Sequence, residues 1–228
     1  MIINQRFLKS IINICASSAL ILSFNVTAQQ DPLVTYVSEG KLVAPWQATI
    51  GNALNWSVPV KDQSAETERK NLTVSASKKN KEGDALLLKW KGKKVKGQWG
   101  GNILYDSSFT LTKNKIDLSS VKDKAAITFD IKINRSPNEA THLAMQCNYN
   151  NNTCQSKFPL KQVLKQLPKD EWFSLPIPLA CFSQTTKGTD FDYKNITSIL
   201  SIATQGKLEI EIANIGLTAM PEGKTGCQ

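Results

Sequence analysis

The chain has 228 residues, of which 28 are lysine or arginine, 19 are aspartate or glutamate and one is histidine, so its formal net charge is +9. The single histidine excludes metal sites built from two histidines, and this length is enough for one domain with a sizeable hydrophobic core. The lysines lie mainly in turns and arginine is scarce, which favours a solvated surface over a nucleic-acid site.

The first 28 residues have the pattern of a secretory signal peptide. Arg6 and Lys9 precede an apolar run at 11–24, and small residues lead to Ala28. The run is shorter than the roughly 20 residues that a membrane span requires. We therefore expect cleavage after Ala28, export to the periplasm or the medium, and no membrane span in the mature chain. Without Arg6 and Lys9 the balance is 26 basic to 19 acidic residues, a net charge of +7.

The mature chain begins with a weakly patterned stretch, which we interpret as an N-terminal extension at 29–45 before one domain at 46–228. Residues 72–76 alternate between apolar and hydroxyl side chains, which predicts a strand. Leu86, Leu88 and Trp90 share one face of a second strand, so a core position is the better interpretation of this tryptophan.

The middle of the chain predicts one strand and one short helix. Residues 125–133 alternate most clearly, with isoleucines and a phenylalanine on one face. Residues 158–167 have leucine and valine at helical spacing, with Pro159 near the first helical position and Pro168 as a stop.

Three more strands are predicted towards the C-terminus. Residues 172–179 alternate and contain two prolines, which remove two backbone donors and place this strand at a sheet edge or at a bulge. Residues 199–203 are apolar throughout, and 207–217 alternate again. Many short strands with one helix predict an all-β fold, an antiparallel β-sandwich of the jelly-roll kind.

Four cysteines remain after cleavage and allow three pairings. Cys147 and Cys154 flank a turn-rich segment that could bring two antiparallel strands side by side, so we predict that they pair. Cys181 and Cys227 then pair by elimination. An exported chain with an even number of cysteines is typical of a disulfide-bonded protein.

No catalytic motif is evident. His142 has no G-x-S-x-G motif to accompany it, and Glu209 and Glu211 lie on one strand face that we interpret as solvated. We therefore expect a protein that is not an enzyme. Asp190 and Asp192 lie in a polar loop and are weak candidates for the ligands of a structural calcium ion, which would be the only cofactor.

Aromatic residues are the remaining functional signal, because a tryptophan can stack on the C–H face of a sugar. Trp99 lies between Gln98 and two glycines, with Asn102 and Tyr105 close in sequence, and is the best candidate for a sugar platform. Core packing is equally compatible with its sequence context. Trp46 and Trp56 are placed by no pattern, and Trp172 is either exposed or covers the sheet edge.

Several motifs together resemble one known family. Residues 82–92 resemble the signature (Q/E)-x-D-A-x-x-x-x-W-x-G, and residues 143–147, Cys154 and 172–182 resemble the series L-x-M-R-C…C…W-x-x-x-x-(I/V)-P-L-x-C-F. Residues 195–208 are similar to the stretch that follows. The chain is thus similar, from about Trp46 to Leu217, to the ExoP-type galactose-binding-like C-terminal domain of bacterial family 3 exo-β-glucanases and β-glucosidases.

The resemblance implies a β-sandwich that accompanies a glucan-cleaving enzyme, and no catalytic role passes to any residue of this sequence. Gln146 stands where the family pattern has arginine, and it joins the ligand-binding candidates. We expect a secreted, non-catalytic module for polysaccharide or oligosaccharide of the β-glucan type. The alternative is an envelope interaction or structural protein that docks on a separate glycosidase or another partner protein.

Overall fold

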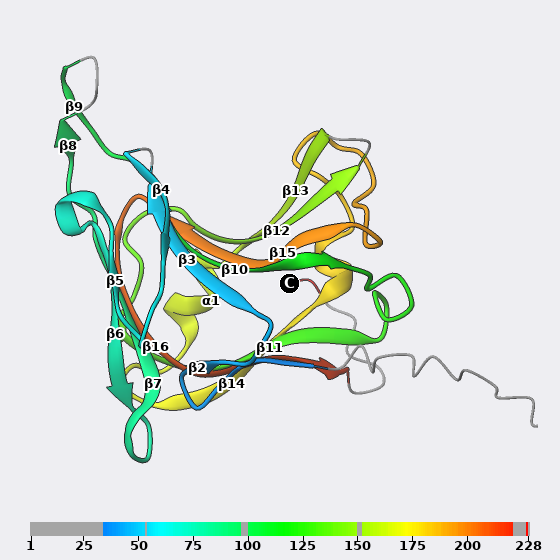
Figure 1. Ribbon diagram of the computed structural model, residues 1–228, viewed down its shortest axis with the longest axis horizontal. Coiled ribbons are helices and arrows are strands. Elements are labelled where there is room, and N and C mark those ends of the chain that lie inside the picture. The colour runs from blue at the N-terminus through cyan, green and yellow to red at the C-terminus, as the bar shows by residue number, and fades with distance from the viewer. Residues whose placement is uncertain (1–33, 53, 97–99, 150–151, 221–226, 228) are drawn as a thin grey trace, which may run out of the picture. The chain divides into compact units, whose positions relative to one another are not determined.

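The computed structural model describes residues 34–52, 54–96, 100–149, 152–220 and 227, all of which belong to one compact unit (Figure 1). Two antiparallel sheets pack against each other there and enclose the core, as expected for a β-sandwich. The predicted signal peptide lies outside the described residues.

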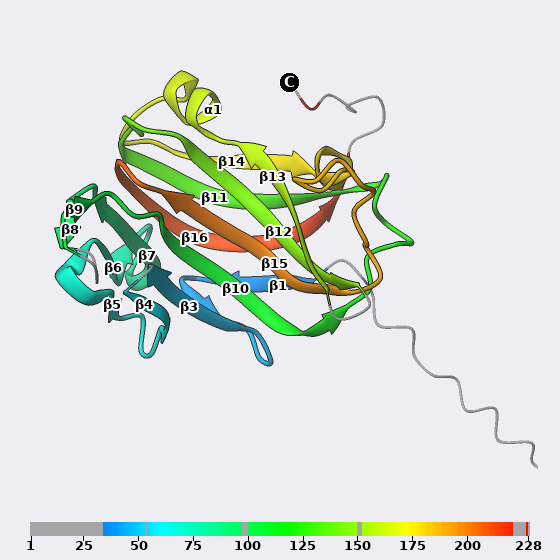
Figure 2. The same ribbon diagram turned by 90° about the horizontal axis from the view of Figure 1, so that it is seen from above.

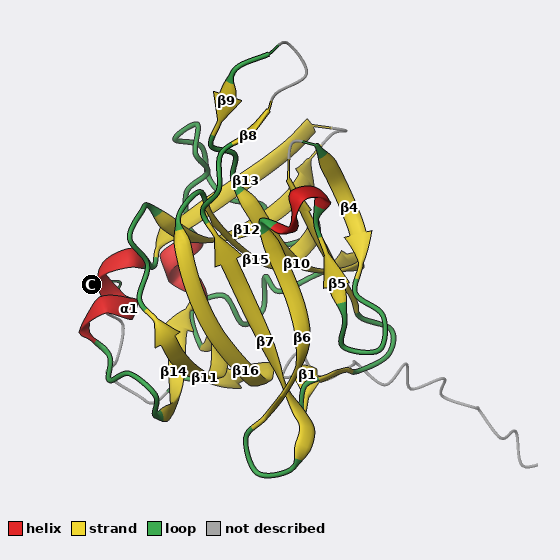
Figure 3. Ribbon diagram, turned by 90° about the vertical axis from the view of Figure 1, so that its left-hand side faces the viewer, coloured by secondary structure: helices red, strands yellow, loops and turns green. Residues whose placement is uncertain are grey.

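The first sheet has eight strands, and Figure 3 shows its longer members side by side. Its main path is β14-β11-β16-β7-β6-β5, and β1 joins it by pairing with β16 and with β2. The bounds of these strands are Trp172–Pro178 for β14, Ala125–Arg135 for β11, Lys207–Ala219 for β16, Glu82–Lys91 for β7, Leu72–Lys78 for β6, Ala65–Glu66 for β5, Thr35–Ser38 for β1 and Lys41–Leu42 for β2.

The second sheet has six strands in the order β13-β12-β15-β10-β3-β4, which Figure 2 shows from above. A separate two-stranded hairpin consists of β8 and β9. The bounds of these strands are Asn152–Pro159 for β13, Thr141–Tyr149 for β12, Ile196–Thr204 for β15, Ser107–Ile116 for β10, Gln47–Asn52 for β3, Asn55–Pro59 for β4, Val95–Lys96 for β8 and Asn102–Ile103 for β9.

The helical elements are short: α1 spans Lys161–Gln166, and the 3-10 helices η1 and η2 span Glu68–Lys70 and Leu179–Phe182. The predicted helix at 158–167 is therefore too long, because its first residues continue β13 as far as Pro159. None of the helices in the described part of the chain is long and apolar enough to cross a membrane.

The core confirms the period-two patterns. The apolar residues of β11 and β16 are buried, and Trp90 of β7 is 2% exposed. The indole N–H of Trp90 donates to the carbonyl oxygen of Ser107 at 2.8 Å, a bond that joins the eight-stranded sheet to the start of β10 in the six-stranded sheet. A buried indole needs such an acceptor, and here it ties the two layers together.

The edge position predicted from the two prolines is confirmed. β14 pairs only with β11 and ends the eight-stranded sheet, with Ile177 opposite Ile127 in the register. Pro176 and Pro178 lack the N–H that a further strand would need, so this edge resists pairing with another chain.

Both predicted disulfides are present. Cys147 and Cys154 face each other in the β12–β13 ladder with Cα atoms 4.9 Å apart, and the Cα atoms of Cys181 and Cys227 are 5.3 Å apart. The segment interpreted as an N-terminal extension contributes β1 and β2 to the eight-stranded sheet, because β1 pairs with β16 beyond the end of β7.

One sequence interpretation is wrong. Glu211 does not lie on a solvated face but is 6% exposed. Its carboxylate accepts hydrogen bonds from Ser77 at 2.6 Å and Asn134 at 2.8 Å, and forms an ion pair with Lys132 at 2.7 Å. The interpretation failed because cross-strand neighbours supply these partners, and alternation along one strand does not reveal them.

Candidate carbohydrate-binding face

The outward face of the six-stranded sheet is the candidate site, and its character begins with β10. Phe109 and Leu111 of this strand are fully buried in the core. Because successive side chains of a strand point to opposite faces, Ser108, Thr110 and Thr112 lie on the outward face. One strand therefore contributes three hydroxyl side chains in a row to the surface.

The registers extend this row across the neighbouring strands. Thr110 is paired with Ser201 of β15 and Thr49 of β3, and the hydroxyl oxygens of Thr110 and Ser201 lie 2.9 Å apart in a hydrogen bond. We define the hydroxyl face as this outward surface; its members are Thr49, Gly51, Ser108, Thr110, Thr112, Ala144, Ser201 and Ala203. Gly51 has no side chain, and the side chains of the other seven are small. Thr49, Ser108, Thr110 and Thr112 are partly exposed, whereas the other four members are buried.

Figures 1 and 2 show how the ends of the face are bounded. The strands of the six-stranded sheet bend so that their ends rise away from the eight-stranded sheet. β4 and the β8–β9 hairpin stand at one end, and the β12–β13 hairpin stands at the other. The hydroxyl face is thus the concave side of its sheet, which is a shape suited to an elongated ligand.

Trp56 is a large aromatic side chain on β4, at the end of the face where β4 and the β8–β9 hairpin stand. The sequence pattern did not place it. It is 86% exposed. The position that a Cβ on Gly51 would take is occupied by the Trp56 carbonyl, so the β4 backbone passes over the outward side of β3 there. The pairing shifts between Ile50 and Asn52, and this irregularity breaks the alternation that would have grouped Trp56 with the inward Val58.

Gln146 is the predicted candidate that the structure places on the outward face. It lies on β12 between Gln155 of β13 and Ser198 of β15, and both glutamines are partly exposed. The neighbouring rung of the ladder is the disulfide between Cys147 and Cys154. The two amide side chains therefore stand beside a covalently fixed rung of the β12–β13 hairpin.

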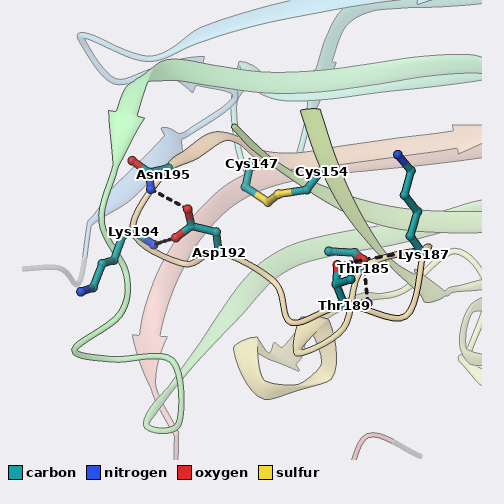
Figure 4. The surroundings of a disulfide bond; sticks show 8 residues. All are labelled: Cys147, Cys154, Thr185, Lys187, Thr189, Asp192, Lys194 and Asn195. Atoms are coloured by element: carbon teal, nitrogen blue, oxygen red, sulfur yellow. Dashed lines mark hydrogen bonds between the residues drawn. A yellow bond between two sulfur atoms is a disulfide. The ribbon is translucent and has the colours of Figure 1, made fainter. Parts of the chain in front are cut away.

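The loop that follows η2 contacts the outer edge of the same hairpin at β13. Figure 4 shows the disulfide beside the loop that carries Thr185 and Thr189, whose hydroxyl oxygens are hydrogen-bonded at 2.8 Å. The N–H of Thr186 donates to the carbonyl oxygen of Gln155 at 2.7 Å. This bond occupies the free edge of β13 and fixes the strand that carries Gln155.

Tyr105 lies at the opposite end of the face from Gln146. Tyr105 is partly exposed and lies two residues before β10 begins at Ser107. Ser107 of β10 pairs with Thr204 of β15, which pairs in turn with Thr141 of β12. Gln146 lies five residues after Thr141 on β12, so the two ends of the face are about 17 Å apart at the usual rise of a strand. Tyr105 and Gln146 could therefore contact one ligand only if it is elongated.

The structure leaves three candidates without a placed side chain. Gln98 and Trp99 lie outside the described residues. Asn102 begins β9, where its backbone pairs with that of Lys96 in β8. The β8–β9 hairpin stands at the same end of the face as β4 (Figure 1).

His142 contributes an imidazole to one border of the face. It lies on the outward side of β12 opposite Ala203. Burial lowers the pKa of its imidazole, the positive charge of Lys157 lowers the pKa further, and Asp106 opposes both effects. The imidazole is therefore neutral at pH 7 and can both donate and accept a hydrogen bond.

The weak calcium candidates lie in a hydrogen-bonded loop. The Asp192 carboxylate accepts hydrogen bonds from the backbone N–H of Lys194 at 2.9 Å and from the amide of Asn195, which caps a turn (Figure 4). The backbone of Asp190 pairs with Gln184 in an isolated bridge. Within the described ranges, no three acidic, histidine or cysteine side chains gather where they could hold a metal ion.

These groups define what the face can do chemically. Hydroxyl and amide side chains both donate and accept hydrogen bonds, and small side chains leave space for a ring or a flat chain. The exposed indole at one end supplies an apolar surface on which a sugar ring can stack. The arrangement suits reversible binding of a neutral, polyhydroxylated ligand.

Comparison with known proteins places the chain in a family. The family model of the ExoP C-terminal domain, described as galactose-binding domain-like, matches residues 44–217. A search of curated proteins returned no match.

Solved structures with the same fold include three of particular interest. The extra C-terminal domain of an exo-1,3/1,4-β-glucanase from a Pseudoalteromonas species has a TM-score of 0.60 and 17% identity over 84% of this chain and 95% of that domain. The glucanase itself has a TM-score of 0.62 and 16% identity over 88% of this chain and 22% of the enzyme. The family 30 carbohydrate-binding module of a cellulosomal cellulase from Clostridium thermocellum has a TM-score of 0.55 and 15% identity over 83% of this chain and 99% of the module.

Proposed function

We propose, since this chain belongs to the galactose-binding-like family of ExoP C-terminal domains, that it is a non-catalytic carbohydrate-binding module whose hydroxyl face binds polysaccharide of the β-glucan type. The observation that carries the proposal is the row of small hydroxyl side chains on the concave side of the six-stranded sheet. An aromatic side chain at one end and two glutamines at the other complete the site.

The chemistry of the face favours a glucan chain over other polymers. Sugar hydroxyl groups match the hydroxyl and amide groups of the face, because each partner can donate and accept. The equatorial hydroxyls of a β-linked glucose chain point sideways and leave flat apolar faces, one of which can lie on the Trp56 indole. A strongly charged polymer would find no counter-charge on the members of the hydroxyl face, and Lys157 opposite Ala144 is a charged group at its border.

The names of the similar structures support this choice of ligand. They include an accessory domain of an exo-1,3/1,4-β-glucanase and a binding module of a cellulosomal cellulase. Both names connect the fold with enzymes that act on β-linked glucose polymers. We extend that connection to this chain as part of the proposal, including a separate glycosidase that acts on the same polysaccharide.

We propose further that the protein works outside the cytoplasm, in the periplasm or as a secreted protein. The support is the predicted signal peptide, with cleavage after Ala28, and the two disulfides of the domain. Disulfides persist in oxidising compartments, where extracellular polysaccharide is also found.

The direct test is affinity gel electrophoresis and calorimetry of the mature protein with mixed-linkage β-1,3/1,4-glucan, laminarin and soluble cellulose derivatives. We expect retardation by at least one of these glucans. Trp56→Ala should weaken that binding by about 10- to 30-fold, the effect of removing an aromatic anchor. The variant should keep the wild-type melting temperature, because the Trp56 side chain is 86% exposed.

Trp172→Ala is the matched control, since it removes the same side chain from β14 of the other sheet. Its glucan affinity should equal that of the wild type. If a folded protein is retarded by none of the glucans, the proposal fails. Recovery of one stoichiometric partner protein from the exporting cell, together with that negative result, would favour the docking function instead.

A further inference from the structure

A hollow separate from the hydroxyl face lies between the edges of the two sheets. Its volume is about 360 Å³, within the range of small-molecule sites. It is lined by β2 and β7 of the eight-stranded sheet, by β3 of the six-stranded sheet and by the connection from β4 to β5. These elements contribute Lys41, Leu42, Val60, Asp62, Gln63 and Leu86. We call it the edge cleft.

The inner part of the edge cleft is apolar. Ala48 and Leu86 are 3% and 2% exposed and belong to the walls where the two sheets meet. Leu42 and Val60 are half-buried and stand closer to the solvent. A ligand in the edge cleft would therefore contact apolar side chains on its inner side.

The outer part of the edge cleft is polar and electrically balanced. Lys41 and Asp62 are exposed and carry opposite charges. Just outside, Lys81 and Glu39 form an ion pair at 2.7 Å. Since each positive charge has a negative counterpart, the cleft does not select an ion of either sign and suits a neutral ligand.

Gln63 is the fixed polar group of the edge cleft. Its amide nitrogen donates to the carbonyl oxygens of Gly40 at 3.1 Å and Gly83 at 2.8 Å. These two bonds use both amide hydrogens and set the direction of the amide oxygen. In the part of the chain that the structure describes, no donor bonds that oxygen, which lies beside Gly83, where a Cβ would come within 3.4 Å of it.

The backbone around the edge cleft is held in uncommon conformations. Glu39, Asp62 and Gln63 have φ values of +48°, +47° and +58°, in the left-handed region that side-chain-bearing residues seldom adopt. Such residues cost conformational energy and concentrate at functional sites. Gly40, with φ +70°, packs so closely on the next strand that a Cβ would come within 2.8 Å of the Ala85 backbone.

We infer that the edge cleft is a second carbohydrate site, which binds one neutral pyranose ring, either a free sugar or the end of a chain. The C–H face of the ring lies on Leu42, Val60 and Leu86. Its hydroxyl groups donate to the Asp62 carboxylate and the Gln63 amide oxygen, and a ring or hydroxyl oxygen accepts from Lys41. This inference goes beyond the proposed function and does not depend on it, because no residue is shared with the hydroxyl face.

The test is an NMR titration of the ¹⁵N-labelled mature protein with D-glucose, D-galactose, D-mannose and cellobiose. We expect saturable shifts of the backbone amides of Gly40, Asp62, Gln63 and Gly83 with at least one sugar. Asp62→Asn should weaken this binding about tenfold, because it removes the charge from one charge-assisted hydrogen bond. Asparagine tolerates the left-handed backbone of this position, so the fold should be kept.

Asp170→Asn is the matched control, because Asp170 is also exposed, has φ +62° and does not line the edge cleft. It should bind the sugar as the wild type does. The inference is overturned if no sugar shifts the four amides up to tens of millimolar, or if both variants weaken binding equally. Shifts confined to Ser108, Thr110 and Ser201 would also overturn it while supporting the hydroxyl face as the glycan site.

Discussion

The outward faces of the two sheets differ although both sheets cover the same core. On the eight-stranded sheet, long ionic side chains pair with one another: Lys132 with Glu211 at 2.7 Å, Lys79 with Asp130 at 3.0 Å and Lys89 with Glu209 at 2.8 Å. On the six-stranded sheet, most outward positions of the central strands carry serine, threonine, alanine or glycine, with His142 and Gln146 on β12 and Lys157 on β13 as larger polar side chains. The first face satisfies its polar groups internally, whereas the second can share its polar groups with a ligand.

The two tryptophans of these surfaces show the same difference. The Trp172 ring has two ammonium groups near it, with the nitrogens of Lys79 and Lys132 at 5.4 and 5.6 Å from the ring centroid. Both lie within the range of a cation–π interaction. Trp56 is 86% exposed. A stacking surface is therefore available at β4, while the one at β14 is already engaged by the protein's own cations.

The largest effect is expected when the internal pairing is broken. Glu211→Ala leaves the half-buried Lys132 ammonium without its counter-ion, and it leaves Ser77 and Asn134 without their acceptor. We expect the free energy of unfolding to fall by about 3 kcal/mol. Glucan binding should be unchanged at a temperature where the variant is folded. Urea denaturation and affinity electrophoresis measure the two quantities.

The matched control is Glu209→Ala on the same strand. Its partner Lys89 has a side chain that is 42% exposed, so this ion pair is screened by water. We expect a loss of no more than about 1 kcal/mol. Equal losses for the two variants would show that burial does not separate the ion pairs as argued.

A second, somewhat smaller effect concerns the β12–β13 hairpin, which bounds one end of the hydroxyl face. Replacing Cys147 and Cys154 together by serine removes a bond between residues seven apart in sequence. Loop-closure entropy predicts a loss of about 2–3 kcal/mol in the free energy of unfolding. Glucan affinity should fall as well, because Gln146 and Gln155 form the adjacent rung of the ladder. A glucan affinity, measured by calorimetry, that stays at the wild-type value would show that this hairpin is not part of the binding site.

The pH dependence of stability is a third test of the ionic pairing on the eight-stranded sheet, through the carboxylate of Glu211. Burial raises the pKa of Glu211, but hydrogen bonds from Lys132, Ser77 and Asn134 outweigh it and lower the pKa below its ordinary value. The unfolded chain therefore takes up this proton first as the pH falls. The stability contributed by Glu211 is complete above the ordinary glutamate pKa of about 4.3 and is lost as the pH falls through the lower folded value.

Glu211→Gln tests that argument, because glutamine keeps the shape and loses the titration. The wild type should be the more stable protein at neutral pH, and the difference should shrink below about pH 4.3. Urea denaturation at a series of pH values measures it. A difference that stays constant down to strongly acidic pH would exclude Glu211 as the source.

Local sequence patterns along the chain were sufficient to predict the longer strands of the eight-stranded sheet and β15. β11, β15 and β16 have patterns in which core residues repeat every second position or fill the strand, and the edge position of β14 follows from its two prolines. The pairing of Cys147 with Cys154 followed from a short turn-rich segment between them. These features depend on neighbours in sequence, so the sequence alone contains enough information.

The candidate site depends on neighbours that are distant in sequence. Ser108, Thr110 and Thr112 alternate with core residues, but only the register brings them beside β15, about ninety residues later in the chain. Trp56 was not placed because an irregularity in the β3–β4 pairing overrides its alternation with Val58. The edge cleft depends on the hydrogen bonds from Gln63 to Gly40, between β1 and β2, and to Gly83 in β7, which no local pattern predicts.

The smallest effect tests the hydroxyl face most directly. Thr110→Val removes one hydroxyl from the pair with Ser201 and keeps the shape and the strand preference of the side chain. We expect stability to change by less than about 1 kcal/mol and glucan affinity to fall about three- to fivefold. Thr128→Val is the matched control, because it breaks the same kind of hydroxyl pair, with Thr218 at 2.6 Å, on the eight-stranded sheet. The control should keep full affinity, and equal affinities for the two variants would show that the hydroxyls of the concave face do not contact the glucan.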